Sequence, residues 1–182
     1  MKTSLLFLFL SSLAGCASTG EITELQKFSG TVDQHKKVVI LLKANSKVEK
    51  DNQYRERFGR ILAKAIAKTE LFDHVGVNKL SGATLKLLVQ FNKISEPNDL
   101  TSVFANSLAN SEIEVTAILA ESTPAIRKLS SLTVTGNSKQ RGRSTVGGIG
   151  VTEATDYTET AMEEAADRIA HYLVQHSRKA EK

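Results

Sequence analysis

The sequence predicts an α+β fold, in which two helices pack on a mostly antiparallel sheet of about five strands in the order β-α-β-β-β-β-α. Three observations lead to this prediction. Residues 37–43 form a continuous apolar run, two segments carry apolar side chains at helical spacing, and the segments between those helices show the two-residue period of strands. Helices and strands of this kind bury their apolar sides by packing as layers.

The sequence of the first half of the domain predicts a strand, a helix and a second strand. Residues 37–43 (KVVILLK) suit a strand that is buried on both faces. From Asp51 the apolar residues follow a helical period, and Asp51 or Asn52 can cap the start of that helix. The predicted apolar face consists of Tyr54, Phe58, Ile61, Leu62, Ala65 and Ile66. Residues 72–77 then predict a short second strand.

The second half predicts a three-stranded meander and a closing helix. Residues 85–91 and 113–119 alternate, with Leu88 as the exception, and residues 129–134 mark a fifth strand. The closing helix is expected to begin near Thr155 or Asp156. Its predicted apolar side includes Met162, Ala165, Ala166, Ile169 and Leu173.

The amino terminus has the pattern of a removable secretion signal. Lys2 precedes a short apolar run at residues 5–10, which is much shorter than the roughly 20 residues that span a membrane. The tetrapeptide Leu13-Ala14-Gly15-Cys16 then resembles the lipobox of bacterial lipoproteins. This resemblance implies cleavage before Cys16 and acylation of its thiol. Ala17 follows the cysteine where an Asp commonly retains proteobacterial lipoproteins at the inner membrane, so we expect a lipid anchor at the periplasmic face of the outer membrane.

Three regions follow from this pattern. Residues 1–15 are the signal peptide, residues 16–36 are the lipidated cysteine with a polar tether, and residues 37–182 are a single periplasmic domain. Cys16 is the only cysteine, so no disulfide is expected within the domain. The net charge of +4 is mild, and we expect no nucleic-acid partner.

The layout of the domain resembles several small proteobacterial lipoprotein families. The segments that carry the resemblance are KVVILLK, ERFGRILAKAIAKTELF, ATLKLLVQF and STVGGIG, followed by the alanine-rich closing helix. The resemblance includes uncharacterised families and the outer-membrane activators of penicillin-binding proteins, whose domain is similar to the amino-terminal domain of the Tol translocation protein. It implies a non-enzymatic accessory role and assigns no functional residue.

Motifs of catalysis and metal binding are weak in this sequence. The glycine-rich residues 142–148 place Gly148 where a phosphate-binding loop needs lysine, and no Gly-x-Ser-x-Gly motif is present. The four histidines are scattered, and we expect them at the surface or at helix ends. They are His35, His74, His171 and His176. We therefore predict no enzyme activity, no cofactor and no metal site.

Two surfaces are candidate contact sites. Arg57, Arg60, Lys64 and Lys68 recur at three- and four-residue steps along the first helix, and such a row can meet an anionic surface or serve as a solvated face. The second candidate is the apolar group Val103, Phe104 and Leu108 in the loop of residues 96–110. That group can mark a partner site or fold back over the sheet.

Three classes of function remain open at this point. The sequence favours an accessory or scaffold lipoprotein that is anchored in the membrane and binds an envelope protein or glycan. The alternative is a carrier or chaperone for a lipid or glycolipid, which requires an apolar groove between the sheet and the helices. A lipid-anchored hydrolase comes last.

Overall fold

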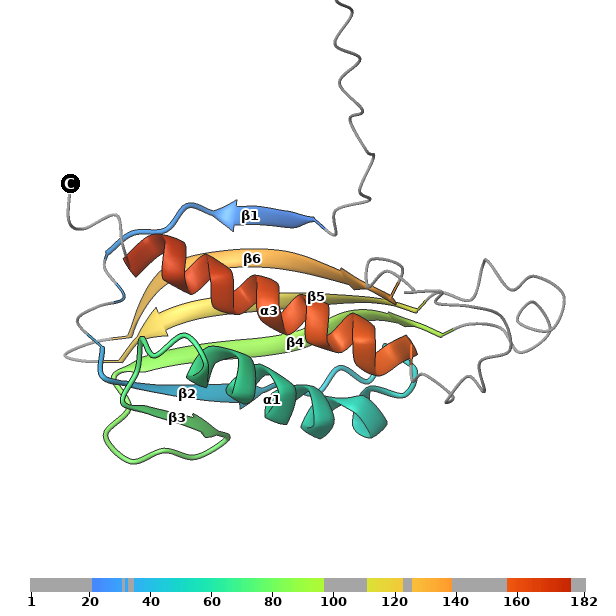
Figure 1. Cartoon of the computed structure of the whole chain (residues 1–182), viewed down its shortest axis with the longest axis horizontal. Helices are drawn as coiled ribbons and strands as arrows, with labels where there is room; N and C mark the ends of the chain where they lie inside the picture. Colours follow the sequence, from blue (N-terminus) through green and yellow to red (C-terminus); the bar gives the residue numbers. More distant parts are fainter. Residues whose placement is uncertain are drawn as a thin grey trace, which may run out of the picture.

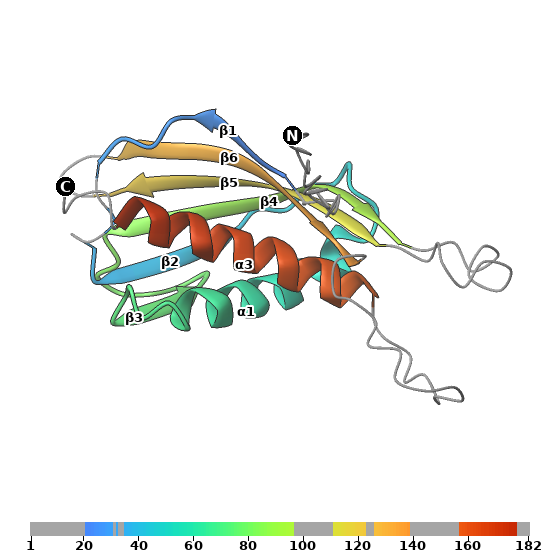
Figure 2. The same ribbon diagram turned by 45° about the horizontal axis from the view of Figure 1, so that its top comes forward.

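The computed structural model describes residues 21–30, 32, 35–96, 111–122, 126–138 and 157–177. Two helices lie side by side on one face of a six-stranded sheet, as Figures 1 and 2 show. This confirms the predicted α+β class with two helices, although the sheet has six strands. The elements are β1 (Ile22–Gln26), β2 (Lys37–Leu42), α1 (Asp51–Ala67), β3 (His74–Val77), β4 (Leu85–Ser95), β5 (Glu112–Glu121), β6 (Arg127–Asn137) and α3 (Tyr157–Ser177).

The sheet is mixed, in the order β1-β6-β5-β4-β2-β3. The pairs β1–β6, β6–β5 and β5–β4 are antiparallel, whereas β2 is parallel to both β4 and β3. Helix α1 connects β2 to β3, and a helical crossover of this kind returns the chain in the same direction. The hairpin β5–β6 needs no such crossover. Three of the five strand pairs are antiparallel, which confirms the predicted mostly antiparallel sheet. The prediction did not include the parallel pairing of β2 with β3 and β4.

The extra strand comes from the segment that was expected to be a tether. Residues 16–36 were predicted as lipidated cysteine and linker, but Ile22–Gln26 pair with β6 at the edge of the sheet. Ile22 is half-buried and the other four residues of β1 are exposed. A five-residue edge strand with one covered side chain has too few apolar residues to show a period, which is why the sequence pattern missed it.

One hydrophobic core fills the space between the helices and the sheet. Alternate residues of β4 and β5 point into it, together with the inner sides of α1 and α3. Leu62 is fully buried as predicted, but Ile61 is only partly buried at the rim of the core. The carrier hypothesis, which requires an apolar groove between the sheet and the helices, stays a prediction.

Two glycines allow the helices to lie close to the sheet. A Cβ atom at Gly136 of β6 would lie 2.0 Å from the carbonyl oxygen of Ala161 in α3. At Gly59 of α1, a Cβ atom would lie 2.5 Å from Cδ1 of Leu42 in β2. Gly136 lets the backbones of β6 and α3 approach closely, and Gly59 leaves room for the side chain of Leu42.

The start of α1 differs from the prediction. Asp51 or Asn52 was expected to cap the helix, but Lys50 is the N-cap residue and no side chain caps the helix there. Lys50 has a φ of 62°, in the left-handed region. Asp51 lies in the first turn, and its Oδ2 accepts a hydrogen bond from Arg55 at 2.6 Å. Among the described residues, no helix is both long and apolar enough to cross a membrane.

Candidate functional site

The predicted site residues fall into two groups. Cys16 and the apolar group Val103, Phe104 and Leu108 lie outside the described residues. The second group is the basic row on α1, which consists of Arg57, Arg60, Lys64 and Lys68 and differs in exposure along its length. Arg57 is half-buried and forms an ion pair with Glu159 of α3, which fastens the two helices together. The three exposed cations of the row are Arg60, Lys64 and Lys68.

One histidine contradicts the expectation of surface histidines. His35 is buried, and its Nδ1 lies 3.0 Å from Oγ1 of Thr84. Burial lowers the pKa of His35, while Glu121 raises it and Arg127 lowers it further. The described part of the chain contains no group of three potential metal ligands among its His, Cys, Asp and Glu residues.

Among the described residues, the face of the sheet opposite α1 and α3 carries no helix, and we call it the helix-free face. It carries an apolar row across its middle strands. Leu41, Leu88 and Ile118 are direct cross-strand partners on β2, β4 and β5. Their sequence neighbours Ile40, Leu87 and Leu119 belong to the core, so this row points to the opposite side. Val39 and Ala120 lie on the same face one pair further along, on either side of Lys86, and are themselves buried. We call Leu41, Leu88 and Ile118, which are half-buried, the apolar row.

Charges of opposite sign flank the apolar row along the strands. Lys86 and Lys128 are the cross-strand partners of Ala120 at one end. Glu112 and Glu114 lie on the same face at the other end of β5, where Lys93 of β4 forms an ion pair with Glu112 and leaves Glu114 as the excess negative charge. With a rise of about 3.4 Å per residue, Ala120 and Glu114 are roughly 20 Å apart. The face therefore has a net positive charge at one end, apolar side chains in the middle and a net negative charge at the other end.

A cluster of polar and aromatic side chains fastens β1 to the sheet and to α3. The Tyr172 hydroxyl donates a hydrogen bond to Oε1 of Glu24 at 2.7 Å and lies 2.7 Å from Oγ of Ser130. Nε2 of His176 lies 3.5 Å from the same Glu24 oxygen, and Phe28 stacks on the His176 ring with centroids 4.6 Å apart. Sequence patterns gave no sign of this cluster, because its members come from β1 and the residues after it, from β6 and from α3.

Burial governs the ionisation of Tyr172. Removal from water raises the pKa of Tyr172 to about 12, since burial penalises the phenolate. The hydrogen bond with Ser130 lowers the pKa, and Glu24 raises it through its hydrogen bond and its charge. The phenol is therefore held neutral and serves as a hydrogen-bond donor.

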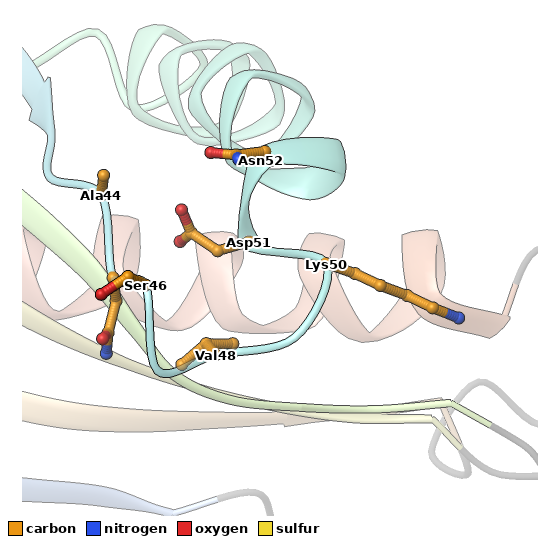
Figure 3. A pocket seen from close by; sticks show the side chains of 7 residues that line it. Ala44, Ser46, Val48, Lys50, Asp51 and Asn52 are labelled. Atoms are coloured by element: carbon orange, nitrogen blue, oxygen red, sulfur yellow. The ribbon is translucent and has the colours of Figure 1, made fainter.

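A hollow lies between the end of β2 and the start of α1 (Figure 3). It has a volume of about 290 Å³. Its lining comes from one continuous stretch, with Ala44, Asn45, Ser46, Val48, Lys50, Asp51 and Asn52. The sequence singled out Asp51 and Asn52 only as helix caps.

The fold is similar to that of solved bacterial proteins. A variant of PelC from Paraburkholderia phytofirmans, described as a dodecamer, matches with a TM-score of 0.55 and 14% identity over 85% of this chain and 97% of that one. A second PelC dodecamer from the same organism matches with a TM-score of 0.55 and 12% identity over the same shares. A DUF330 protein from Xanthomonas campestris matches with a TM-score of 0.51 and 14% identity, over 87% of this chain and 92% of that one.

These likenesses show the fold alone. No protein-family model and no curated protein sequence matches the chain. The resemblance to penicillin-binding-protein activators and to the Tol protein stays a prediction.

Proposed function

We propose that the chain is a lipid-anchored, non-enzymatic accessory or scaffold lipoprotein of the bacterial envelope, which binds an envelope protein through the helix-free face of its sheet. The observation that carries the proposal is the apolar row at the middle of that face. Apolar side chains gathered on one face are typical of sites where another protein packs. Lipidation at Cys16 would hold this face at the periplasmic side of the outer membrane.

The partner that fits this face best is a second copy of the chain. Two copies related by a twofold axis would bring the Lys86 end of one face against the Glu114 end of the other, with the apolar rows between them. Such a contact is self-complementary, as twofold interfaces require, and it resembles the packing of two sheets face to face. PelC, which has a similar fold, is described as a dodecamer, so a fold of this kind is compatible with self-association.

The test is the mass of the full acylated chain in detergent, measured by light scattering after gel filtration. We expect an oligomer for the wild type and a protomer for Leu88→Lys, which places a charge in the apolar row. Ile126→Lys is the matched control, because Ile126 is 78% exposed immediately before β6 and lies outside the row. This variant should assemble like the wild type.

A charge exchange tests the arrangement of the two copies. Lys86→Glu should weaken the assembly, and Lys86→Glu combined with Glu114→Lys should restore it, because the double variant rebuilds the opposite-charge pair. A protomeric wild type at every concentration, or full assembly of Leu88→Lys, would contradict self-association through this face.

A further inference from the structure

The hollow at the start of α1 contains a carboxylate oxygen without a hydrogen-bond partner. The Asp51 side chain is only 5% exposed, and its Oδ2 is paired with Arg55. Its Oδ1 is buried and has no hydrogen-bond partner among the described residues. Buried acceptors in native proteins are nearly always paired, so an unpaired one points to a missing donor.

The carboxylate points toward the hollow and lies in its wall, where neighbouring atoms cover Oδ1. Figure 3 shows it pointing toward the segment that carries Ala44 and Ser46, while the Lys50 side chain extends away. The Lys50 ammonium pairs with Glu96. The hollow of about 290 Å³ is much larger than the roughly 30 Å³ that a water molecule occupies. It lies at the lower end of the range of small-molecule pockets, which suits a single ring-sized unit.

The charges around the hollow favour a neutral ligand. Arg55 already balances the charge of Asp51, so an added cation would meet the guanidinium and an added anion would meet the carboxylate. A hydroxyl group can donate to Oδ1 without bringing a charge into the hollow. The side chains of Ser46 and Asn52 can both donate and accept, and Ala44 and Val48 add apolar wall. This mixture matches a ring that carries hydroxyls on its rim and C–H groups on its faces.

We infer that the hollow is a subsite for one saccharide unit of an envelope glycan, with a ring hydroxyl donating to Oδ1 of Asp51. The assignment goes beyond the proposed function, because the subsite borders α1 and the apolar row lies on the opposite side of the sheet. Self-association and saccharide binding can each fail without the other.

The experiment is a titration of the full ¹⁵N-labelled chain, followed by NMR in a detergent without a sugar headgroup. The probes are glucose, galactose, mannose and N-acetylglucosamine. A ligand of this size is expected to bind with a Kd on the order of millimolar, so each probe is raised to roughly 100 mM. At least one sugar should shift the backbone amides of residues 44–52. Ammonium chloride and sodium acetate at the same concentration serve as the cation and anion probes.

Two variants with matched controls identify the subsite. Asp51→Ala should weaken binding of the sugar at least fivefold, whereas Gln53→Ala, in the same turn but outside the lining, should not. Ala44→Leu fills the hollow from an exposed position and should abolish the shifts, whereas Gln53→Leu should preserve them. The comparison of Ala44→Leu with Gln53→Leu tests the subsite even if Asp51→Ala does not fold. Failure of every sugar to shift residues 44–52, stronger shifts from either ion, or unchanged binding by Ala44→Leu would overturn the assignment.

Discussion

At the scale of single residues, the cluster around Tyr172 decides how the amino-terminal segment joins the domain. Glu24 of β1 accepts a hydrogen bond from Tyr172 and lies beside His176, both near the end of α3. Ser130 of β6 donates to the carbonyl oxygen of Gln26 at 3.0 Å. A lipid at Cys16 would attach the chain to the membrane a few residues before β1. The cluster would then hold the first strand after the anchor in place on the domain.

The raised pKa of Tyr172 predicts a specific loss of stability in alkali. The folded state holds the phenolic proton up to a pKa of about 12, whereas the unfolded chain releases it near 10. The contribution of Tyr172 to the free energy of unfolding is therefore fully present below about pH 10 and is lost as the pH rises toward 12. The loss should amount to about 2 kcal/mol.

Urea unfolding at a series of pH values measures this loss. Tyr172→Phe should start from a lower stability, by about 1 kcal/mol for the lost hydrogen bonds. Its free energy of unfolding should then decline less steeply between pH 10 and 12 than that of the wild type, since all other tyrosines are retained. Parallel pH curves for the two proteins would contradict the assignment.

At the scale of elements, α1 shows how a helical period fixes a face without fixing its width. Tyr54, Phe58, Leu62 and Ile66 are buried as their spacing predicts. Ile61 has the same chemistry but lies at the edge of the buried side, next to a basic row that itself divides between solvent and α3. Which edge residue is covered depends on where the neighbouring helix lies.

The two neighbours Leu62 and Ile61 give a direct comparison of burial. Leu62→Ala should cost about 2–5 kcal/mol of unfolding free energy, because the site is fully packed. Ile61→Ala should cost less than half as much, since solvent already reaches that side chain. Lys64→Ala, exposed on the same helix, should change stability by about 0.5 kcal/mol or less. Equal losses at Ile61 and Leu62 in denaturant melts would show that α1 is rotated from its described position.

At the scale of the whole molecule, the sheet has one face covered by helices and one face free of them in the described residues (Figure 2). This asymmetry gives the chain a natural place for a partner. The lipid anchor would determine where that partner is met. The proposed location at the outer membrane therefore depends on acylation of Cys16.

Replacing Cys16, the proposed site of acylation, tests the anchor directly. Cys16→Ser should leave an uncleaved or soluble species, because a serine hydroxyl does not accept the diacylglycerol. Metabolic labelling with a radioactive fatty acid should mark the wild type and Ser18→Ala but not Cys16→Ser. Equal label in Cys16→Ser would remove the basis for an anchored protein.

The sequence by itself determined the class of the fold, because helical and strand periods are local. The spacing of Tyr54, Phe58 and Leu62 and the alternation of Leu85, Leu87 and Val89 require only neighbouring residues, and the structure confirms both. Element positions along most of the chain follow from the same local patterns.

Only the tertiary structure decided the features that join distant segments. The pairing of β1 with β6 and the contact between Tyr172 and Glu24 bring together residues more than 100 positions apart. The parallel pairing of β2 with β4 and the alignment of Leu41, Leu88 and Ile118 likewise arise from packing. Local periodicity carries no information on which strands pair, and the apolar row exists only because three strands pair in this register.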